Sequence, residues 1–373
     1  MLFRSHQIRS ANRERHYLQR VADRARGIKE TSAAFSWKSD AANRISFFIF
    51  LLGFEVFRAM SMLMVVFSDL SIGQMIAVYA YLWFMMGPVQ EILSIQYTYY
   101  AANAAMVRVN SILTLNTEPH FEHKINPFTG ENTVALRVEN IDFSYADGEP
   151  VLNGLSLNIK KGEKIALVGT SGGGKSTLVQ IILGMYMPDR GQIYFNEVPV
   201  TEIGLDVVRE NVATVLQHPA LFNDTIKHNL NLGKEYSEAE LWNALEVAQL
   251  SETIRALPQQ LNTIVGRSGV RLSGGQRQRL AVARMILAQP KVVILDEATS
   301  ALDTETESKL HTAMQSFLKG RTTLIIAHRL TSVKQADRVY VFDDGKIIDE
   351  GVHEEMVLRD GLYRQLYGAH LDA

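Results

Sequence analysis

The chain has 373 residues, a formal net charge of −2 and no cysteine. Its length allows two or three domains of ordinary size. The balanced charge gives no general sign of nucleic-acid binding, and we expect no nucleic-acid partner. The lack of cysteine excludes disulfides, thiolate metal ligands and cysteine nucleophiles.

Two long apolar segments follow a basic N-terminal region. The first covers residues 45–67 and the second covers about residues 72–95, with no Asp, Glu, Lys or Arg in residues 72–90. Each is long enough to cross the hydrocarbon core of a bilayer, about 30 Å, as a helix. A buried helical hairpin of a soluble protein is the alternative, but core helices are seldom apolar on every face over this length. The segments therefore predict two transmembrane helices.

The distribution of charge predicts how these helices are oriented. Ten arginines and lysines lie between residues 4 and 44, whereas Asp69 is the charged residue of the turn between the segments. The positive-inside rule then places the N-terminus in the cytoplasm, and two crossings return the chain there after about residue 100. We expect a multi-pass protein of a bacterial inner membrane, with membrane lipid around its helices.

Two charged residues interrupt the first apolar segment. Glu55 and Arg58 are three residues apart and so lie on one helix face. Each charge would cost about 2.5–3.5 kcal/mol in the middle of a bilayer, so we expect the two to pair or to face a wet cavity. A contact to a transported substrate and an ion pair that locks helix packing both fit this pattern.

The composition changes after the second segment. Its helical pattern becomes amphipathic and ends at Asn116-Thr117-Glu118-Pro119. Turn-forming residues follow, and then alternating apolar residues that predict strands. The predicted organisation is a partial transmembrane domain, a linker and an α/β domain, at residues 1–118, 119–133 and 134–373.

A phosphate-binding loop lies between a predicted strand and a predicted helix. Residues 164–168 are apolar, and residues 169–176 read GTSGGGKS, which is the pattern G-x-x-x-x-G-K-[ST] in the setting that it requires. The loop amides would surround phosphate oxygens, Lys175 would reach the β- and γ-phosphates, and Ser176 would bind Mg²⁺. The predicted nucleotide ligands of this loop are Gly169, Thr170, Ser171, Gly172, Gly173, Gly174, Lys175, Ser176 and Thr177.

Two adjacent carboxylates follow a second buried strand at residues 292–295. Ligand chemistry in parallel sheets gathers at the carboxyl ends of strands. Asp296 would therefore hold Mg²⁺ through its water shell, and Glu297 would polarise the attacking water. With the phosphate loop, this pair predicts an α/β P-loop NTPase that uses Mg²⁺. A GTPase of this class should carry an N-K-x-D motif, which the sequence lacks.

Residues 134–373 resemble the ATP-binding cassette (ABC) family over the whole length of the cassette. Besides the phosphate loop and the paired carboxylates, the resemblance rests on markers in family order, namely Tyr145, Gln217 in VLQHPALFNDTI, LSGGQ at residues 272–276, SALD at residues 300–303 and His328 in TTLIIAHRL. It implies that ATP is the nucleotide. A kinase would lack the LSGGQ signature and would not need the two apolar segments.

The resemblance also implies roles for these residues. Tyr145 would stack on adenine, although Phe143 nearby leaves this choice open. Gln217 would sense Mg²⁺, completing a metal set with Ser176 and Asp296. His328 would contact the γ-phosphate and help to hold the water in line with Glu297.

The signature at residues 272–276 has no lysine to grip a phosphate and no strand directly before it. In the family, two cassettes pack head to tail, and each signature contacts the γ-phosphate held by the other chain. Ser273 and the amides of Gly274 and Gly275 can seat a phosphate at the start of the following helix. Gln276 and Asp303 complete the expected nucleotide-binding set. The expected partner is a second ABC subunit, in a homodimer or a heterodimer.

The two regions together resemble an ABC exporter with fused membrane and nucleotide-binding domains. The expected function is ATP hydrolysis coupled to export of an unidentified lipid, drug, peptide or siderophore. A membrane-tethered regulatory ATPase and an ABC ATPase without transport are the alternatives.

The chain departs from the exporter pattern in two places. Exporter halves usually have six spans, so two spans suggest an N-terminally truncated chain or missing spans on another polypeptide. A contact glutamate is common before the signature, but residues 263–269 read TIVGRSG, with Arg267 at that place.

Overall fold

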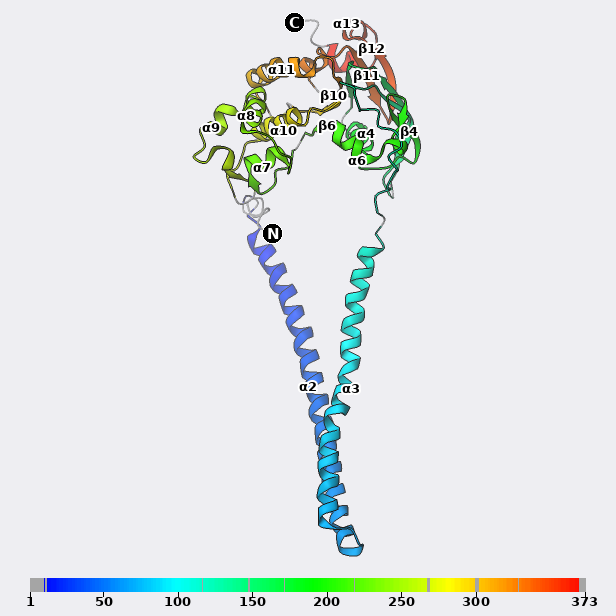
Figure 1. Ribbon diagram of the computed structural model, residues 1–373, viewed down its shortest axis with the longest axis vertical. Helices are drawn as coiled ribbons and strands as arrows, with labels where there is room; N and C mark the ends of the chain where they lie inside the picture. The colour runs from blue at the N-terminus through cyan, green and yellow to red at the C-terminus, as the bar shows by residue number, and fades with distance from the viewer. Residues whose placement is uncertain are drawn as a thin grey trace. The chain divides into compact units, whose positions relative to one another are not determined.

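The computed structural model describes residues 10, 12–115, 117–146, 148–170, 172–217, 219–266, 269–298, 302–327 and 329–368. The chain divides into two compact units, Met1–Thr117 and Glu118–Ala373. The first is built from long helices and the second from sheets and shorter helices (Figure 1). The predicted fold class, a helical region followed by an α/β domain, is therefore confirmed.

The first unit is a hairpin of two helices, α2 (Glu14–Phe67) and α3 (Ile72–Leu113). Ser71 begins α3 with a capping box, in which its side chain and that of Gln74 satisfy each other's backbone N–H groups. α2 starts far before the apolar segment, so the basic extension and the predicted span form one helix. Within the part of the chain that the structure describes, one helix, α2, is long and apolar enough to cross a membrane. The second predicted span falls in α3 and stays a prediction.

Aromatic side chains hold the hairpin together near its turn. The Phe54 ring contacts those of Tyr79 and Trp83, with centroids 5.8 and 6.2 Å apart. The Tyr79 hydroxyl donates to the Arg58 carbonyl oxygen at 3.2 Å. Arg58 also pairs with Glu55, at 2.6 Å between Nη2 and Oε2. This ion pair is one of the two arrangements predicted for these charges.

The second unit contains two main sheets. The larger has the strand order β12-β11-β3-β10-β9-β6 and is parallel except for the β11–β12 pair. The smaller is antiparallel, in the order β2-β1-β4-β5. The strands of the large sheet are β3 (Lys164–Gly169), β6 (Val212–Val215), β9 (Val292–Asp296), β10 (Thr322–Ile326), β11 (Arg338–Asp343) and β12 (Lys346–Gly351).

The remaining strands are β1 (Leu136–Ser144), β2 (Pro150–Ile159), β4 (Arg190–Phe195), β5 (Val198–Pro199) and the short pair β7 (Asp224–Thr225) and β8 (Ile264–Val265). The helices are α4 (Lys175–Ile182), α5 (Val200–Ile203), α6 (Leu205–Asn211), α7 (Ile226–Asn231), α8 (Glu238–Val247), α9 (Ser251–Arg255), η2 (Gln260–Asn262), α10 (Gly274–Ala288), α11 (Thr304–Leu318), α12 (Leu330–Val333), α13 (His353–Met356) and α14 (Leu362–Tyr367).

The central strands are buried on both faces, which is why they read as continuous apolar runs. Alternate residues of β3 belong to two different cores. Ile165 and Leu167 pack with α4 and the antiparallel sheet, whereas Ala166 and Val168 pack with residues of α8, α10 and α11. In Figure 1, α8, α10 and α11 lie on one side of the strands and α4 and β4 on the other. Because β3, β10 and β9 are parallel neighbours, their carboxyl ends lie at one edge of the sheet.

Candidate active site

The predicted phosphate loop joins the end of β3 to the start of α4. Gly169 has a φ of +154°, and a Cβ at this position would lie 1.9 Å from the carbonyl oxygen of Phe342. Gly174, with a φ of +108°, precedes the first helical residue. Glycine alone tolerates these conformations and this close approach of β11. The Thr170 hydroxyl donates to the Asp343 carboxylate at 3.1 Å, which fixes the start of the loop.

Lys175 is the first residue of α4 and is 5% exposed. Its Nζ donates to the carbonyl oxygens of Gly169 at 3.0 Å and Thr170 at 2.7 Å. Burial lowers the pKa of the Lys175 ammonium, while the charges of Glu297 and Asp296 act in the opposite direction. An ammonium group removed from water in this way has a strong electrostatic preference for an anionic ligand.

A cavity of about 370 Å³ lies beside this loop. It brings together eight predicted site residues from four parts of the sequence. The residues that line it are Tyr145, Val151, Gly172, Gly174, Lys175, Ser176, Thr177, Gln217, Glu297 and Ile326. A lysine, three hydroxyls and a glutamine amide thus face the same space as a carboxylate. This donor set fits a nucleotide phosphate together with a hard cation.

Glu297 and Gln217 are in direct contact at this cavity. The Nε2 of Gln217 donates to Oε2 of Glu297 at 2.6 Å. Asp296 is the last residue of β9 and is 6% exposed. Glu297 follows with a φ of +47°, a left-handed conformation that is unfavourable for glutamate. Such backbone strain concentrates at functional sites.

The structure separates the two aromatic candidates for adenine. Phe143, on β1, is buried in the core with 5% exposure, whereas Tyr145 is 41% exposed and lines the cavity. The Tyr145 hydroxyl lies 3.0 Å from Oγ1 of Thr177. The Tyr186 ring packs edge-on against Tyr145 with centroids 5.4 Å apart. Tyr186 was not predicted from the sequence, because only the fold brings the segment after α4 beside β1.

The signature residues lie at the start of α10. Ser273 caps this helix, its Oγ accepts the N–H of Gln276 at 3.2 Å, and its own N–H donates to the Gln276 side chain at 2.8 Å. Among the described residues that line the cavity, none comes from Ser273, Gly274, Gly275 or Gln276. Asp303 likewise caps α11 through the N–H of Thr306 at 2.9 Å and does not line the cavity. One chain therefore does not bring its own signature to its own phosphate loop.

Several predicted residues fall outside the described part of the chain. They are Ser171, Arg267, Ser300, Ala301 and His328. Their roles stay predictions.

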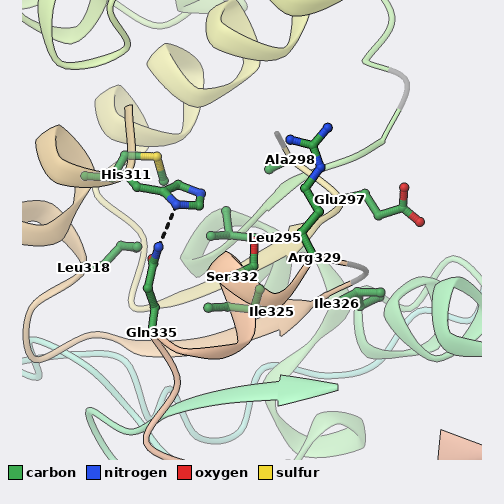
Figure 2. Close-up of a pocket in the computed structure, with 11 residues that line it drawn as sticks. Leu295, Glu297, Ala298, His311, Leu318, Ile325, Ile326, Arg329, Ser332 and Gln335 are labelled. Atoms are coloured by element: carbon green, nitrogen blue, oxygen red, sulfur yellow. Dashed lines mark hydrogen bonds between the residues drawn. The ribbon is translucent and has the colours of Figure 1, made fainter. Parts of the chain in front are cut away.

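A second, smaller cavity of about 70 Å³ lies between α11 and the ends of β9 and β10. Figure 2 shows that the Glu297 carboxylate points away from His311 and Gln335, which line the other side of this cavity. Gln335 Nε2 donates to His311 Nδ1 at 2.6 Å. Arg329 pairs with the buried Glu307 beside them. Burial lowers the pKa of His311, which favours the neutral form of its ring.

We expect the melting temperature of the chain to fall as pH decreases through the unfolded-state pKa of histidine, about 6.5. The folded-state pKa of His311 is lower than this value, so the unfolded chain takes up a proton first and stability is lost toward acid. The variant His311→Gln, which cannot take up that proton, should lose less of its melting temperature than the wild type between about pH 7.5 and about pH 5.5. Equal losses in the two proteins would contradict this role of His311.

Comparison with known proteins identifies the family. A sequence model described as "ABC transporter" matches residues 152–300. The ATP-dependent lipid A-core flippase of Photobacterium profundum is 38% identical over 304 residues, which cover 80% of this chain and 51% of that protein. Multidrug resistance protein pgp-1 of Caenorhabditis elegans is 43% identical over 237 residues, or 63% of this chain and 18% of that protein. The chain thus spans about half the length, or less, of these curated relatives.

A solved structure is similar over nearly all of the chain. It is the structure of a bacterial Atm1-family ABC exporter with ATP bound, with a TM-score of 0.85 and 29% sequence identity. The match covers 99% of this chain and 64% of that chain. With the phosphate loop, the paired carboxylates and the LSGGQ helix in place, the chain belongs to the ABC transporter family, and over nearly its whole length it is similar to an exporter of that family.

Proposed function

We propose that the chain is the ATP-hydrolysing subunit of an ABC exporter, which couples ATP binding and hydrolysis to export across a membrane. The observation that carries this proposal is the cavity where Lys175, Ser176, Gln217 and Glu297 meet. Positioning and electrostatic stabilisation account for most of the catalysis of phosphoryl transfer, and these four side chains supply both.

In the proposed reaction, water attacks the γ-phosphate in line with the leaving ADP. Lys175 offsets the negative charge on the transferred phosphoryl group. Glu297 accepts a proton from the water as the water oxygen bonds to phosphorus. ADP leaves with the electron pair of the broken P–O bond. The Gln217 amide, 2.6 Å from Glu297, holds the carboxylate toward the cavity. His328 would contact the γ-phosphate and help to align the water.

Mg²⁺ is the proposed metal. Ser176, Gln217 and Asp296 would hold it, and it would neutralise phosphate charge as ATP is bound. Hydroxyl, amide and carboxylate oxygens are the hard ligands that this ion prefers. Tyr145 is the proposed adenine contact, because it is the exposed member of the aromatic pair at the cavity.

The proposed partner is a second ABC subunit, in a homodimer or a heterodimer. Ser273 is exposed at the N-terminus of the 15-residue helix α10. A helix N-terminus attracts anions, so Ser273, Gly274 and Gly275 are suited to a γ-phosphate presented by another chain. Each of the two nucleotides would then contact both subunits.

The proposed location is an inner membrane, with the cassette in the cytoplasm. The apolar part of α2 is suited to lipid, and its basic extension is suited to the cytoplasmic side. Among the relatives, one is named a lipid A-core flippase and another a multidrug resistance protein. We therefore propose an amphipathic, lipid-like molecule as the exported substrate.

Phosphate release from Mg-ATP by the whole chain in lipid nanodiscs tests this proposal. We expect Lys175→Ala to lower the rate at least about 100-fold, since it removes the buried cation at the transferred phosphoryl group. Lys346→Ala, at an exposed position of β12, should hydrolyse ATP at the wild-type rate. If the two alanine variants were equally active, the phosphate loop would not be the site of hydrolysis.

A further inference from the structure

Gln278 is a buried polar side chain that the proposed reaction does not use directly. It is the fifth residue of α10, is 1% exposed, and is surrounded on that helix by buried Leu280, Ala281 and Val282. Its Nε2 donates to the carbonyl oxygens of Gln217 at 3.1 Å and Glu297 at 3.3 Å. One amide nitrogen therefore contacts both segments that carry the proposed water-activating groups.

With these two contacts, Gln217, Glu297 and Gln278 are all linked to one another by hydrogen bonds. The side chains of Gln217 and Glu297 are joined at 2.6 Å, and Gln278 holds the main chain behind each of them. Burying an amide in an apolar helix face is costly unless it makes hydrogen bonds. The cost is offset here by two bonds that converge on a single catalytic contact.

The conformation of Glu297 needs such support. Its φ of +47° is unfavourable for a glutamate and persists only where neighbouring groups hold it. Its N–H donates to the Ile326 carbonyl oxygen at 3.3 Å, from β10, and its own carbonyl accepts from Gln278, on α10. Two elements thus fix the Glu297 backbone from opposite ends, and the carboxylate is left to face the cavity.

We propose that Gln278 is a positioning residue for ATP hydrolysis, acting by holding the backbones of Gln217 and Glu297. This inference rests on the proposed function. Gln278 is absent from the described residues that line the nucleotide cavity, so it acts through Gln217 and Glu297 and not on the nucleotide. Ser273 is the N-cap of α10, so one helix carries both the residue proposed to seat the partner's phosphate and the residue proposed to hold the general base of its own chain.

Removing the hydrogen bonds of Gln278 should lower the rate of ATP turnover and leave the affinity for nucleotide nearly unchanged. Gln278→Met keeps the length of the side chain and removes its N–H groups, which leaves both carbonyls without this donor. We expect kcat to fall about 10- to 100-fold, because the general base is no longer held in place. The affinity for a non-hydrolysable ATP analogue should change less than about threefold, because Gln278 does not contact the phosphate loop.

Two comparisons make the test specific. Gln315→Met, an equivalent change at an exposed position of α11, should keep the wild-type kcat. Gln278→Met combined with Glu297→Gln should be no slower than Glu297→Gln alone, since holding the Gln217–Glu297 contact in place adds nothing once that carboxylate is gone.

A second variant, Gln278→Glu, tests the same proposal if Gln278→Met does not fold. Gln278→Glu has the same shape, and only its protonated carboxyl group can donate a hydrogen bond. Burial raises the pKa of a carboxyl group, so kcat of this variant relative to the wild type should rise as pH is lowered. The same ratio for Gln315→Glu should not change with pH.

The outcomes separate this inference from the proposed function. A wild-type chain that releases no phosphate overturns the proposed function and this inference with it. An active wild type beside a folded Gln278→Met variant with the kcat of Gln315→Met overturns this inference alone. So does a multiplicative loss in the double variant, or a Gln278→Glu variant whose relative kcat does not respond to pH.

Discussion

We expect Glu297→Gln to bind ATP and to hydrolyse it about 100- to 10,000-fold more slowly than the wild type. The amide cannot accept a proton from water, although it fills the same space as the carboxylate. Lys175 and the loop glycines are unchanged, so the nucleotide should still be held by the groups that bind its phosphates. ATP should therefore accumulate on the chain, and the bound nucleotide should trap the proposed dimer.

Single-turnover phosphate release and size-exclusion chromatography with Mg-ATP measure these two effects. Glu246→Gln, at an exposed position of α8, is the matched control and should behave as the wild type. Turnover by Glu297→Gln within a few fold of the wild type would remove Glu297 from the role of general base.

We expect two inactive variants to restore activity when they are mixed. Ser273→Arg should fill the place of the γ-phosphate at the start of α10, and Lys175→Ala removes the cation of the phosphate loop. Each alone spoils both sites of a homodimer. A mixed dimer keeps one intact site, made of the loop from the first variant and the signature from the second. With random pairing, half of the dimers are mixed and each has one site of two, so the mixture should reach about a quarter of wild-type activity.

A control is needed to show that Ser273→Arg loses ATPase activity because of the phosphate contact and not because of the lost helix cap. Ser237 offers a matched control, because it caps α8 with the same kind of capping box, which it forms with Glu240. Losing either cap costs about 0.5–2 kcal/mol of stability. Ser237→Arg should therefore be destabilised like Ser273→Arg and remain active. A mixture no more active than its two parents would contradict a site shared between subunits.

The phosphate loop could be predicted from the sequence because its determinants are local. Gly169, Gly174 and Lys175 stand within seven positions, and the strand and helix on either side follow from apolar patterning. The same holds for Asp296 and Glu297 at the end of β9. Strand ends in a parallel sheet meet at one edge, which is why two distant motifs form one cavity.

Other features depend on contacts that no local pattern records. The two acceptors of Gln278 are 61 and 19 positions away along the chain. Tyr186 reaches Tyr145 only through the packing of α4 against the antiparallel sheet. The one available sign of Gln278 was an amide on an apolar helix face, which is also typical of a structural core residue.

The bounds of helix α2 could be predicted only in part. Apolar composition identified residues 45–67, whereas α2 extends from Glu14 to Phe67. Composition marks the part of a helix that is suited to lipid, and the helix itself continues through polar residues, since no proline interrupts it.

The dependence of specific ATPase activity on protein concentration tests most directly whether two chains build each site. In our account, activity per chain falls toward zero as dilution separates the subunits and returns when the protein is concentrated again. Mass photometry on the same samples gives the fraction of monomer at each concentration. Full specific activity in a sample that contains only monomers would contradict the account.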